Sequence, residues 1–257
     1  MCLILAALGQ HSDYPLVVAA NRDEFYQRPT SPMHWWQNPE VLAGKDDRSG
    51  GTWLAVNPAG EVTAVTNVRD GIEEPGWKSR GELPLRALST DRNRLDAELR
   101  EERHRFGGFN LLDMNVSSGW HFSNRDTHPG RHLHRGLYGV SNHLLQSPWP
   151  KLIKLRQSCH QVISQEGTRG AEPLHQALID TLRDDTPAPD HLLPDTGVGL
   201  ETERFLSPAF IRSQDYGTRA TTIVTVHKDG WVRVTEQAWG PWGQPGAQIS
   251  FQWRARA

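Results

Sequence analysis

The chain has 257 residues, enough for one large domain or two small ones. Its 28 Lys and Arg residues nearly balance 30 Asp and Glu residues, and both signs are interspersed, so the composition argues against a nucleic-acid or polyanion partner. The only cysteines in the sequence, Cys2 and Cys159, exclude a disulfide framework, and we expect a cytoplasmic protein.

The first predicted element is a strand that starts directly after Met1. Residues 2–8 are apolar, lack a basic leading segment and are followed by Gly9, so the run is too short for a signal peptide or a membrane span. It predicts a buried β-strand. A second apolar run, 16–20, follows a turn-forming segment, and the two runs predict a hairpin. The tetrad Asn21-Arg22-Asp23-Glu24 would then lie just beyond the second strand.

The middle of the chain predicts a further hairpin and then helices. Residues 53–57 and 61–66 flank the turn sequence Asn57-Pro58-Ala59-Gly60, and Asn67 ends this hairpin. A helical stretch from Leu83 to His104 follows, interrupted near Asp91, which could cap the second part. The remaining predictions are strands at 109–114, 119–123, 137–140, 219–227 and 231–237, and helices at 149–163, ended by Gly167, and 171–183.

These elements predict a single α+β domain over residues 1–257. The Pro-rich stretch 187–194 is interpreted as a surface loop, because no Pro/Gly/Ser linker divides the chain cleanly. Two central helical regions with strand hairpins before and after them fit stacked antiparallel sheets covered by helices. Neither a βαβ alternation nor a Gly-rich phosphate loop is present, which argues against a doubly wound nucleotide-binding sheet.

Cys2 is the candidate nucleophile. A methionine aminopeptidase accepts cysteine as second residue, and removal of Met1 would leave one residue with a thiol and a free α-amine. Their reference pKa values are about 8.5 and about 7.7–8.0, so near neutral pH the amine could accept the thiol proton. The alternative is that Cys2 is a small, inert core residue.

Polar residues at the ends of predicted strands could complete such a site. Asp23 could hold the ammonium of the terminal cysteine, or could be an ordinary turn aspartate. Asn67 and Asn142 could donate hydrogen bonds to an oxyanion, although asparagine also ends strands because it tolerates turn geometry. Arg219 opens a strand of β-branched residues, where its charge would need a carboxylate from Asp23, Glu24 or a substrate.

Several motifs occur in a fixed order along the whole chain. They are Met1-Cys2, Asn21-Arg22-Asp23-Glu24, Gly50-Gly51-Thr52-Trp53-Leu54-Ala55-Val56, Thr66-Asn67, Val140-Ser141-Asn142 and Tyr216-Gly217-Thr218-Arg219. Together they resemble the NRDE family, also called the transport and Golgi organization protein 2 family. That family is similar to the N-terminal-nucleophile hydrolases, most closely the choloylglycine hydrolase and penicillin V acylase branch. The resemblance implies a four-layer αββα sandwich.

The resemblance also implies roles for individual residues. The catalytic set would be Cys2 as nucleophile, Asp23 near its α-amine, Asn67 and Asn142 around the oxyanion, and Arg219 in the charge network. The acylase branch has an arginine shortly before its aspartate, where this chain has Ala20. Arg22 follows Asn21 instead, and because it alternates with Asp23 it need not face the nucleophile. We expect substrate contacts from Asn21, Arg22, Trp35, Trp36 and Trp53.

The aromatic and histidine residues leave a binding role open. His34-Trp35-Trp36 could form a hydrophobic lip for an acyl chain or a planar ligand, or a surface loop pinned by two indoles. His128, His132 and His134 have a spacing that could ligate a metal, but we expect a solvated or packing role and no metal, because no recognised ligand pattern accompanies them. No C-x-x-C-H motif for covalent haem attachment is present in the sequence.

Three hypotheses follow. The chain could be a cysteine N-terminal-nucleophile amidohydrolase that cleaves a linear amide through a thioester and needs no cofactor. It could instead bind haem or a lipid-like acyl compound without turnover, since some eukaryotic relatives are associated with such ligands. The third hypothesis is a structural or interaction role. The first predicts loss of Met1 and a reactive Cys2 thiol.

Overall fold

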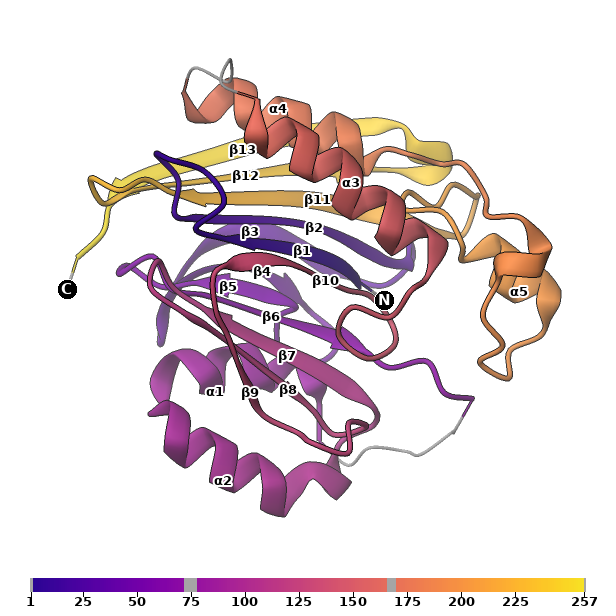
Figure 1. The fold of residues 1–257 in the computed structure, drawn as a ribbon, viewed down its shortest axis with the longest axis horizontal. Helices are drawn as coiled ribbons and strands as arrows, with labels where there is room; N and C mark the ends of the chain where they lie inside the picture. The colour runs from indigo at the N-terminus through magenta and orange to yellow at the C-terminus, as the bar shows by residue number, and fades with distance from the viewer. Residues whose placement is uncertain (1, 72–77, 166–169, 257) are drawn as a thin grey trace.

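The computed structural model describes residues 2–71, 78–165 and 170–256, which form two antiparallel β-sheets stacked face to face with helices outside both (Figure 1). This confirms the α+β class and the αββα layering expected from the sequence. The six-stranded sheet has the order β10 (Gly136–Val140), β1 (Cys2–Leu8), β2 (Leu16–Phe25), β11 (Tyr216–Val226), β12 (Trp231–Trp239) and β13 (Pro245–Arg254).

The seven-stranded sheet follows the order of the chain. Its strands are β3 (Thr30–Gln37), β4 (Glu40–Asp46), β5 (Leu54–Val56), β6 (Val62–Asn67), β7 (Phe109–Met114), β8 (Gly119–Ser123) and β9 (Arg131–Leu133). Helices α1 (Leu83–Ser89) and α2 (Arg92–Glu102) lie below this sheet in Figure 1, and α3 (Pro150–Ser164) and α4 (Ala171–Leu182) lie above the six-stranded sheet. The short α5 (Leu200–Phe205) lies to one side.

The first two strands are buried on both faces, which explains their nearly continuous apolar runs. Side chains on one face of β1, among them Ile4 and Ala6, pack between the two sheets. Those on the other face, among them Leu3 and Leu5, pack beneath α3 and α4. Because successive side chains of a strand point to opposite faces, the polar residues that follow in β2 are divided between the same two environments.

Several elements match their predictions closely. The Asp91 carboxylate caps α2 by accepting hydrogen bonds from the backbone N–H groups of Asn93 and Arg94. Cys159 is fully buried on the inner face of α3, as the helical spacing predicted. The predicted helix end at Gly167 lies outside the described residues.

The prediction was wrong about where β2 ends. We expected the Asn21-Arg22-Asp23-Glu24 tetrad beyond the strand, but β2 continues through Phe25. The tetrad stays in the ladder because β1 pairs with β2 on one side and β11 on the other, so backbone pairing outweighs the polar side chains. Strands β3, β4, β9 and β13 and helix α5 were not predicted. The edge strand β13 is mostly exposed, so its sequence lacks a strong apolar pattern.

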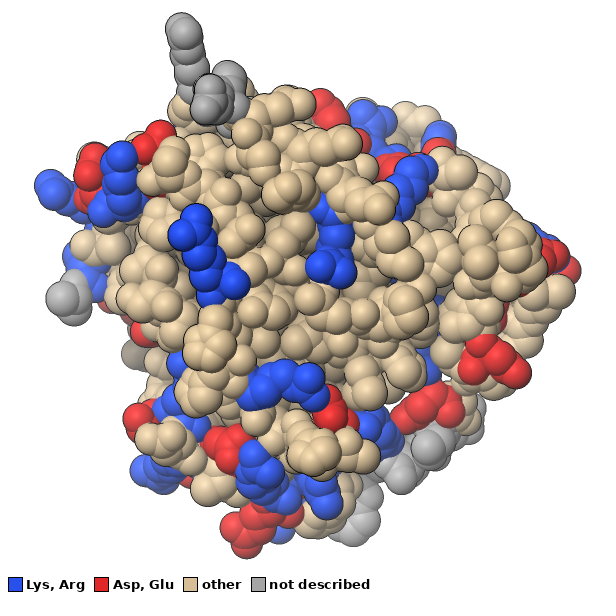
Figure 2. Space-filling model, in the orientation of Figure 1, with Lys and Arg blue, Asp and Glu red and all other residues tan. Residues whose placement is uncertain are grey.

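Charges are mixed on the face seen in Figure 2. Around α2, at the bottom of the view, Lys and Arg lie next to Asp and Glu, while the centre of this face carries few charges. Ion pairs at i,i+4 spacing, Arg94 with Glu98 and Arg100 with Asp96, account for part of this pattern. In the described part of the chain, no helix is long and apolar enough to cross a membrane.

Candidate active site

Cys2 lies at the start of β1, at one end of the six-stranded sheet. Only 8% of its surface is exposed, and it contributes to the wall of a cavity of about 570 Å³ between the sheets. Its partner in the antiparallel ladder is Arg22 on β2, so the two side chains share a face. Asn67, at the end of β6, and Trp53 line the same cavity. The structure therefore brings together four of the residues singled out from the sequence.

Arg22 faces this cavity, contrary to the expectation that it need not face the nucleophile. Alternation along β2 shows only that Arg22 and Asp23 point to opposite faces. The register between β1 and β2 is what places Arg22 beside Cys2. Its guanidinium carbon lies 4.5 Å from the ring centroid of Trp53, and Nη2 donates to Asp46 Oδ2 at 3.3 Å. Its side chain is only 6% exposed, and among the described residues Nη1 has no hydrogen-bond partner.

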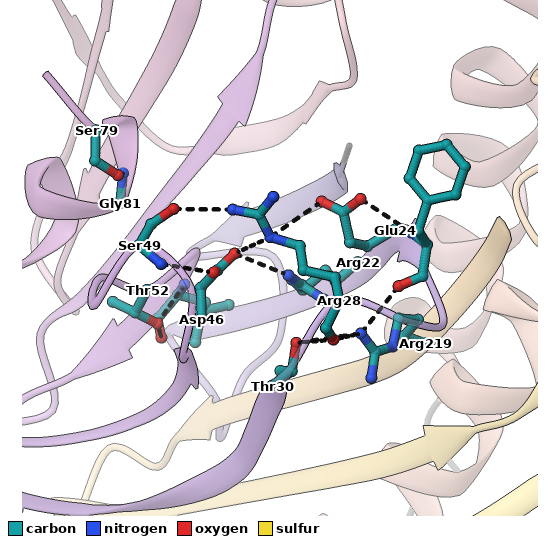
Figure 3. A network of polar contacts seen from close by, with 12 residues as sticks. Arg22, Glu24, Arg28, Thr30, Asp46, Ser49, Thr52, Ser79, Gly81 and Arg219 are labelled. Atoms are coloured by element: carbon teal, nitrogen blue, oxygen red, sulfur yellow. Dashed lines mark hydrogen bonds and ion pairs between the residues drawn. The ribbon is translucent and has the colours of Figure 1, made fainter. Parts of the chain in front are cut away.

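An ion-pair network closes one side of the cavity (Figure 3). Arg28 Nε donates to Asp46 Oδ2 at 2.6 Å and its Nη2 donates to Ser49 Oγ at 2.9 Å, while Glu24 lies 3.9 Å from Arg28. Burial alone would raise the pKa of Asp46, but hydrogen bonds from Arg28 and Ser49 hold it below its usual value. Sequence reasoning missed Arg28 and Asp46, and only their proximity to the tetrad and the Gly50-Gly51 motif could have indicated them.

Arg80, also missed from the sequence, lines the cavity from a 3₁₀ turn at Arg80–Glu82. Two glycines let this turn approach the loop before Trp53: a Cβ on Gly51 would lie 2.5 Å from the backbone of Gly81. The Thr52 N–H then donates to the Gly81 carbonyl at 2.9 Å. A Cβ on Gly81 would lie 3.2 Å from Gly51 Cα, so the close backbone contact depends chiefly on the glycine at position 51.

Asp23 lies on the face of β2 opposite to Arg22, toward the helices. It is 2% exposed, and Thr218 Oγ1 donates to its Oδ1 at 2.7 Å. Burial raises the pKa of Asp23, although nearby cations including Lys151 oppose the shift. Lys151, on α3, was missed from the sequence; its Nζ donates to the Leu206 carbonyl at 2.8 Å, and burial lowers its pKa to about 8.

The two asparagines have different positions. Asn67 lines the cavity, whereas Asn142 uses its side-chain Nδ2 to donate to the Asn67 carbonyl at 3.1 Å. The Asn142 carbonyl accepts the Arg69 N–H at 2.7 Å. Asn142 therefore holds the end of β6, and its amide does not line the cavity.

Arg219 does not pair with Asp23. A β-bulge at this position of β11 directs its guanidinium to the turn between β2 and β3. There Nη1 donates to the Phe25 carbonyl at 3.1 Å, to the Arg28 carbonyl and to Thr30 Oγ1 at 3.2 Å (Figure 3). Backbone carbonyls thus take the place of the expected carboxylate.

Three residues expected to contact substrate lie away from this cavity. Asn21 faces α4, where its amide donates to the carbonyls of Leu182 and Ala209. Trp35 packs edge-on against Trp253 with ring centroids 4.9 Å apart, and Trp36 donates to the Ala43 carbonyl. We expected a loop beside the tetrad here, but both indoles lie in β3, the edge strand of the seven-stranded sheet.

The histidine motif falls at the far edge of the seven-stranded sheet. His132 lies in the three-residue strand β9, which ends before His134, so these two histidines do not lie in one strand. Among the described residues, no group of three or more His, Cys, Asp and Glu side chains is placed to hold a metal ion.

The family model and the sequence relatives agree on the family. The Transport and Golgi organisation 2 model matches residues 1–241. The chain is 33% identical over 243 residues to the Transport and Golgi organization 2 homolog of Mus musculus and 34% identical over 240 residues to that of Homo sapiens. Each alignment covers 88% of this chain and 87% of the relative.

One solved structure shows the same fold at low identity. The C2A mutant of a conjugated bile acid hydrolase from Clostridium perfringens matches with a TM-score of 0.51 and 9% identity, covering 98% of this chain and 92% of that chain. The fold is thus that of the N-terminal-nucleophile hydrolases. With the family match over most of its length, the chain belongs to the Transport and Golgi organisation 2 family.

Proposed function

We propose that the protein is a cysteine N-terminal-nucleophile amidohydrolase that cleaves a linear amide through a thioester intermediate. The observation that carries this proposal is the position of Cys2: it begins β1 and lines the cavity with Asn67, while Asp23 lies in the adjacent strand. The solved structure of similar fold is that of a conjugated bile acid hydrolase, which supports the reaction class but identifies no substrate for this chain.

The proposed reaction begins with removal of Met1. The Cys2 sulfur attacks the amide carbonyl carbon while the α-amine accepts the thiol proton, and Asn67 donates to the oxyanion. The C–N bond then breaks, and the leaving amine takes the proton from the ammonium. Water attacks the thioester, a C–O bond forms, the C–S bond breaks and the thiol is restored.

Because Cys2 is buried, its thiol needs the α-amine as a base. Burial raises the pKa of the Cys2 thiol, against the opposing effect of cations that include Arg22, so the resting thiol is protonated and must lose its proton during attack. Asp23, buried and bonded to Thr218, would orient the α-amine.

The same burial favours a second candidate function. A protonated, enclosed thiol beside a large cavity also suits a protein that holds haem or an acyl compound without turnover. Under this alternative, uptake of the ligand should be saturable and should survive Cys2→Ala.

The test is the intact mass of the purified protein before and after iodoacetamide treatment at pH 7.5. We expect a mass lacking Met1 and labelling at one thiol, faster than that of a simple thiol and absent in Cys2→Ala. Cys159 is an internal control: burial raises its pKa to about 12, and, unlike Cys2, it neither lines the cavity nor would carry a free α-amine. Retained Met1, or labelling no faster than free cysteine, would reject the hydrolase mechanism and favour the carrier.

A further inference from the structure

The charges that line the Cys2 cavity are not balanced within it. Asp46 accepts from Arg22 and Arg28, and Glu24 lies near Arg28. Of the other three charged side chains at its wall, two have partners outside the cavity: Lys78 pairs with Glu102 at 2.6 Å, and Asp70 with Arg125 at 2.6 Å. This leaves Arg80 as the cation of the cavity wall without a carboxylate partner among the described residues.

Arg80 has few other contacts. Its Nη1 donates to the Gly108 carbonyl at 3.1 Å, and no carboxylate of the described residues lies within ion-pair distance. Burial lowers the pKa of Arg80, with Cys2 and Asp70 among the nearby groups that oppose this. A partly buried cation without a counter-charge is costly, and an anionic ligand would offset that cost.

Arg22 supplies a second free donor in the same cavity. Its Nη2 donates to Asp46 and its face is stacked on Trp53, but Nη1 is buried and has no partner in the part of the chain that the structure describes. The indole and Asp46 hold the guanidinium in one orientation, which is the arrangement that suits recognition of a planar anion. A buried N–H without a partner also indicates a position where a ligand atom would accept.

We propose that the cavity beside Cys2 binds a compound that carries a carboxylate group, held by Arg22 and Arg80. This inference rests on the proposed function, because it takes the cavity as the substrate site. It narrows the substrate to an amide that also carries a carboxylate group. A carboxylate carries one negative charge, which matches Arg80, the one cation of this wall that has no carboxylate partner in the described part of the chain. A phosphate monoester carries about 1.5–2 negative charges near pH 7, so one cation would leave part of its charge uncompensated.

The test measures binding and does not require turnover. Titration calorimetry would use full-length Cys2→Ala protein at pH 7.5 and fixed ionic strength, with N-acetylglycine and its neutral analogue N-acetylglycinamide as probes. We expect at least tenfold tighter binding of N-acetylglycine, and a loss of tenfold or more in Arg80→Met. Arg94→Met is the matched control, because Arg94 lies on the exposed face of α2 and its replacement changes the net charge equally.

A second variant and a second anion keep the outcome clear. Arg80→Lys retains the charge and should bind N-acetylglycine more tightly than Arg80→Met, and thermal denaturation checks that each variant is folded. Equal affinity for the two probes, binding of neither, or equal effects of Arg80→Met and Arg94→Met would overturn the proposal. Tighter binding of inorganic phosphate than of N-acetylglycine would overturn the assignment to a carboxylate. Rapid Cys2 labelling without carboxylate preference would leave the hydrolase proposal standing, whereas carboxylate binding with an unreactive Cys2 would reject only the hydrolase.

Discussion

Gly44→Ala should destabilise the protein through Trp53. A Cβ on Gly44, in β4, would lie 2.2 Å from Cη2 and 2.6 Å from Cζ2 of the Trp53 indole. Carbon atoms in contact are separated by about 3.5–4.0 Å, so the indole would have to move by more than about 1 Å. Trp53 packs in the core between the sheets and carries the Arg22 guanidinium, so it cannot move freely.

The magnitude follows from three contributions. Overpacking a core costs about 1–3 kcal/mol. Loss of the contact between Trp53 and Arg22 adds about 0.5–1 kcal/mol, while replacing a strand glycine by alanine gains about 0.5–1 kcal/mol. We therefore expect the free energy of unfolding to fall by about 1–3 kcal/mol.

Urea denaturation measures this change, and Gly240→Ala is the matched control. Gly240 has a φ of −99° and its added Cβ would have 3.8 Å to the nearest atom, so alanine fits there. The penalty of Gly44→Ala should largely disappear when Trp53→Leu is already present, since the clashing ring atoms are then gone. A Gly44→Ala protein as stable as Gly240→Ala, or a penalty unchanged by Trp53→Leu, would refute the reasoning.

Three further outcomes are expected. His175 is buried between Thr225 and Thr235, and burial lowers its pKa to about 3. As the pH falls below about 6.5, this histidine takes up a proton in the unfolded chain but not in the folded protein. The free energy of unfolding should therefore drop by about 2 kcal/mol between pH 7 and pH 5 because of this residue. Urea titrations at both pH values should show that drop reduced in His175→Gln, and an unchanged pH dependence would contradict it. Arg219→Met removes the donors to the turn between β2 and β3 and should cost about 1–3 kcal/mol, with faster proteolysis at residues 26–29; protection equal to that of the unmodified protein would exclude the role. Asn142→Ala should loosen the end of β6 and slow any Cys2 labelling without abolishing it, whereas complete loss would indicate that Asn142 acts on the reacting atoms directly.

Most of the layering could be predicted because it depends on local apolar patterns. Strands such as β7 and β8 are short apolar runs with turn residues between them, and the spacing of buried residues on α3 is helical. Strands β3 and β13 escaped prediction because they lie at sheet edges, where half-exposed positions leave little apolar signal.

The candidate site was predictable only in part, because its geometry depends on register. Alternation within β2 separates Arg22 from Asp23, but only the pairing of β2 with β1 shows that Arg22 is the residue beside Cys2. The partners of Asn142 and Arg219 are backbone carbonyls, which the sequence does not identify. Lys151 and Arg80 come from a helix and a turn that carry no distinguishing motif, so only the tertiary structure brings them to the site.

The turn at residues 26–29 is one of the places where the chain passes from one sheet to the other. Arg28, on this crossing, donates to Asp46 in the seven-stranded sheet. Arg219, in the six-stranded sheet, donates to the Phe25 and Arg28 carbonyls of the same crossing. Sliding or spreading of the sheets would therefore strain these bonds, and because the cavity has walls in both sheets, the same movement would change the space in front of the Cys2 thiol. The width of the cavity therefore depends on how the two sheets are held together at this crossing.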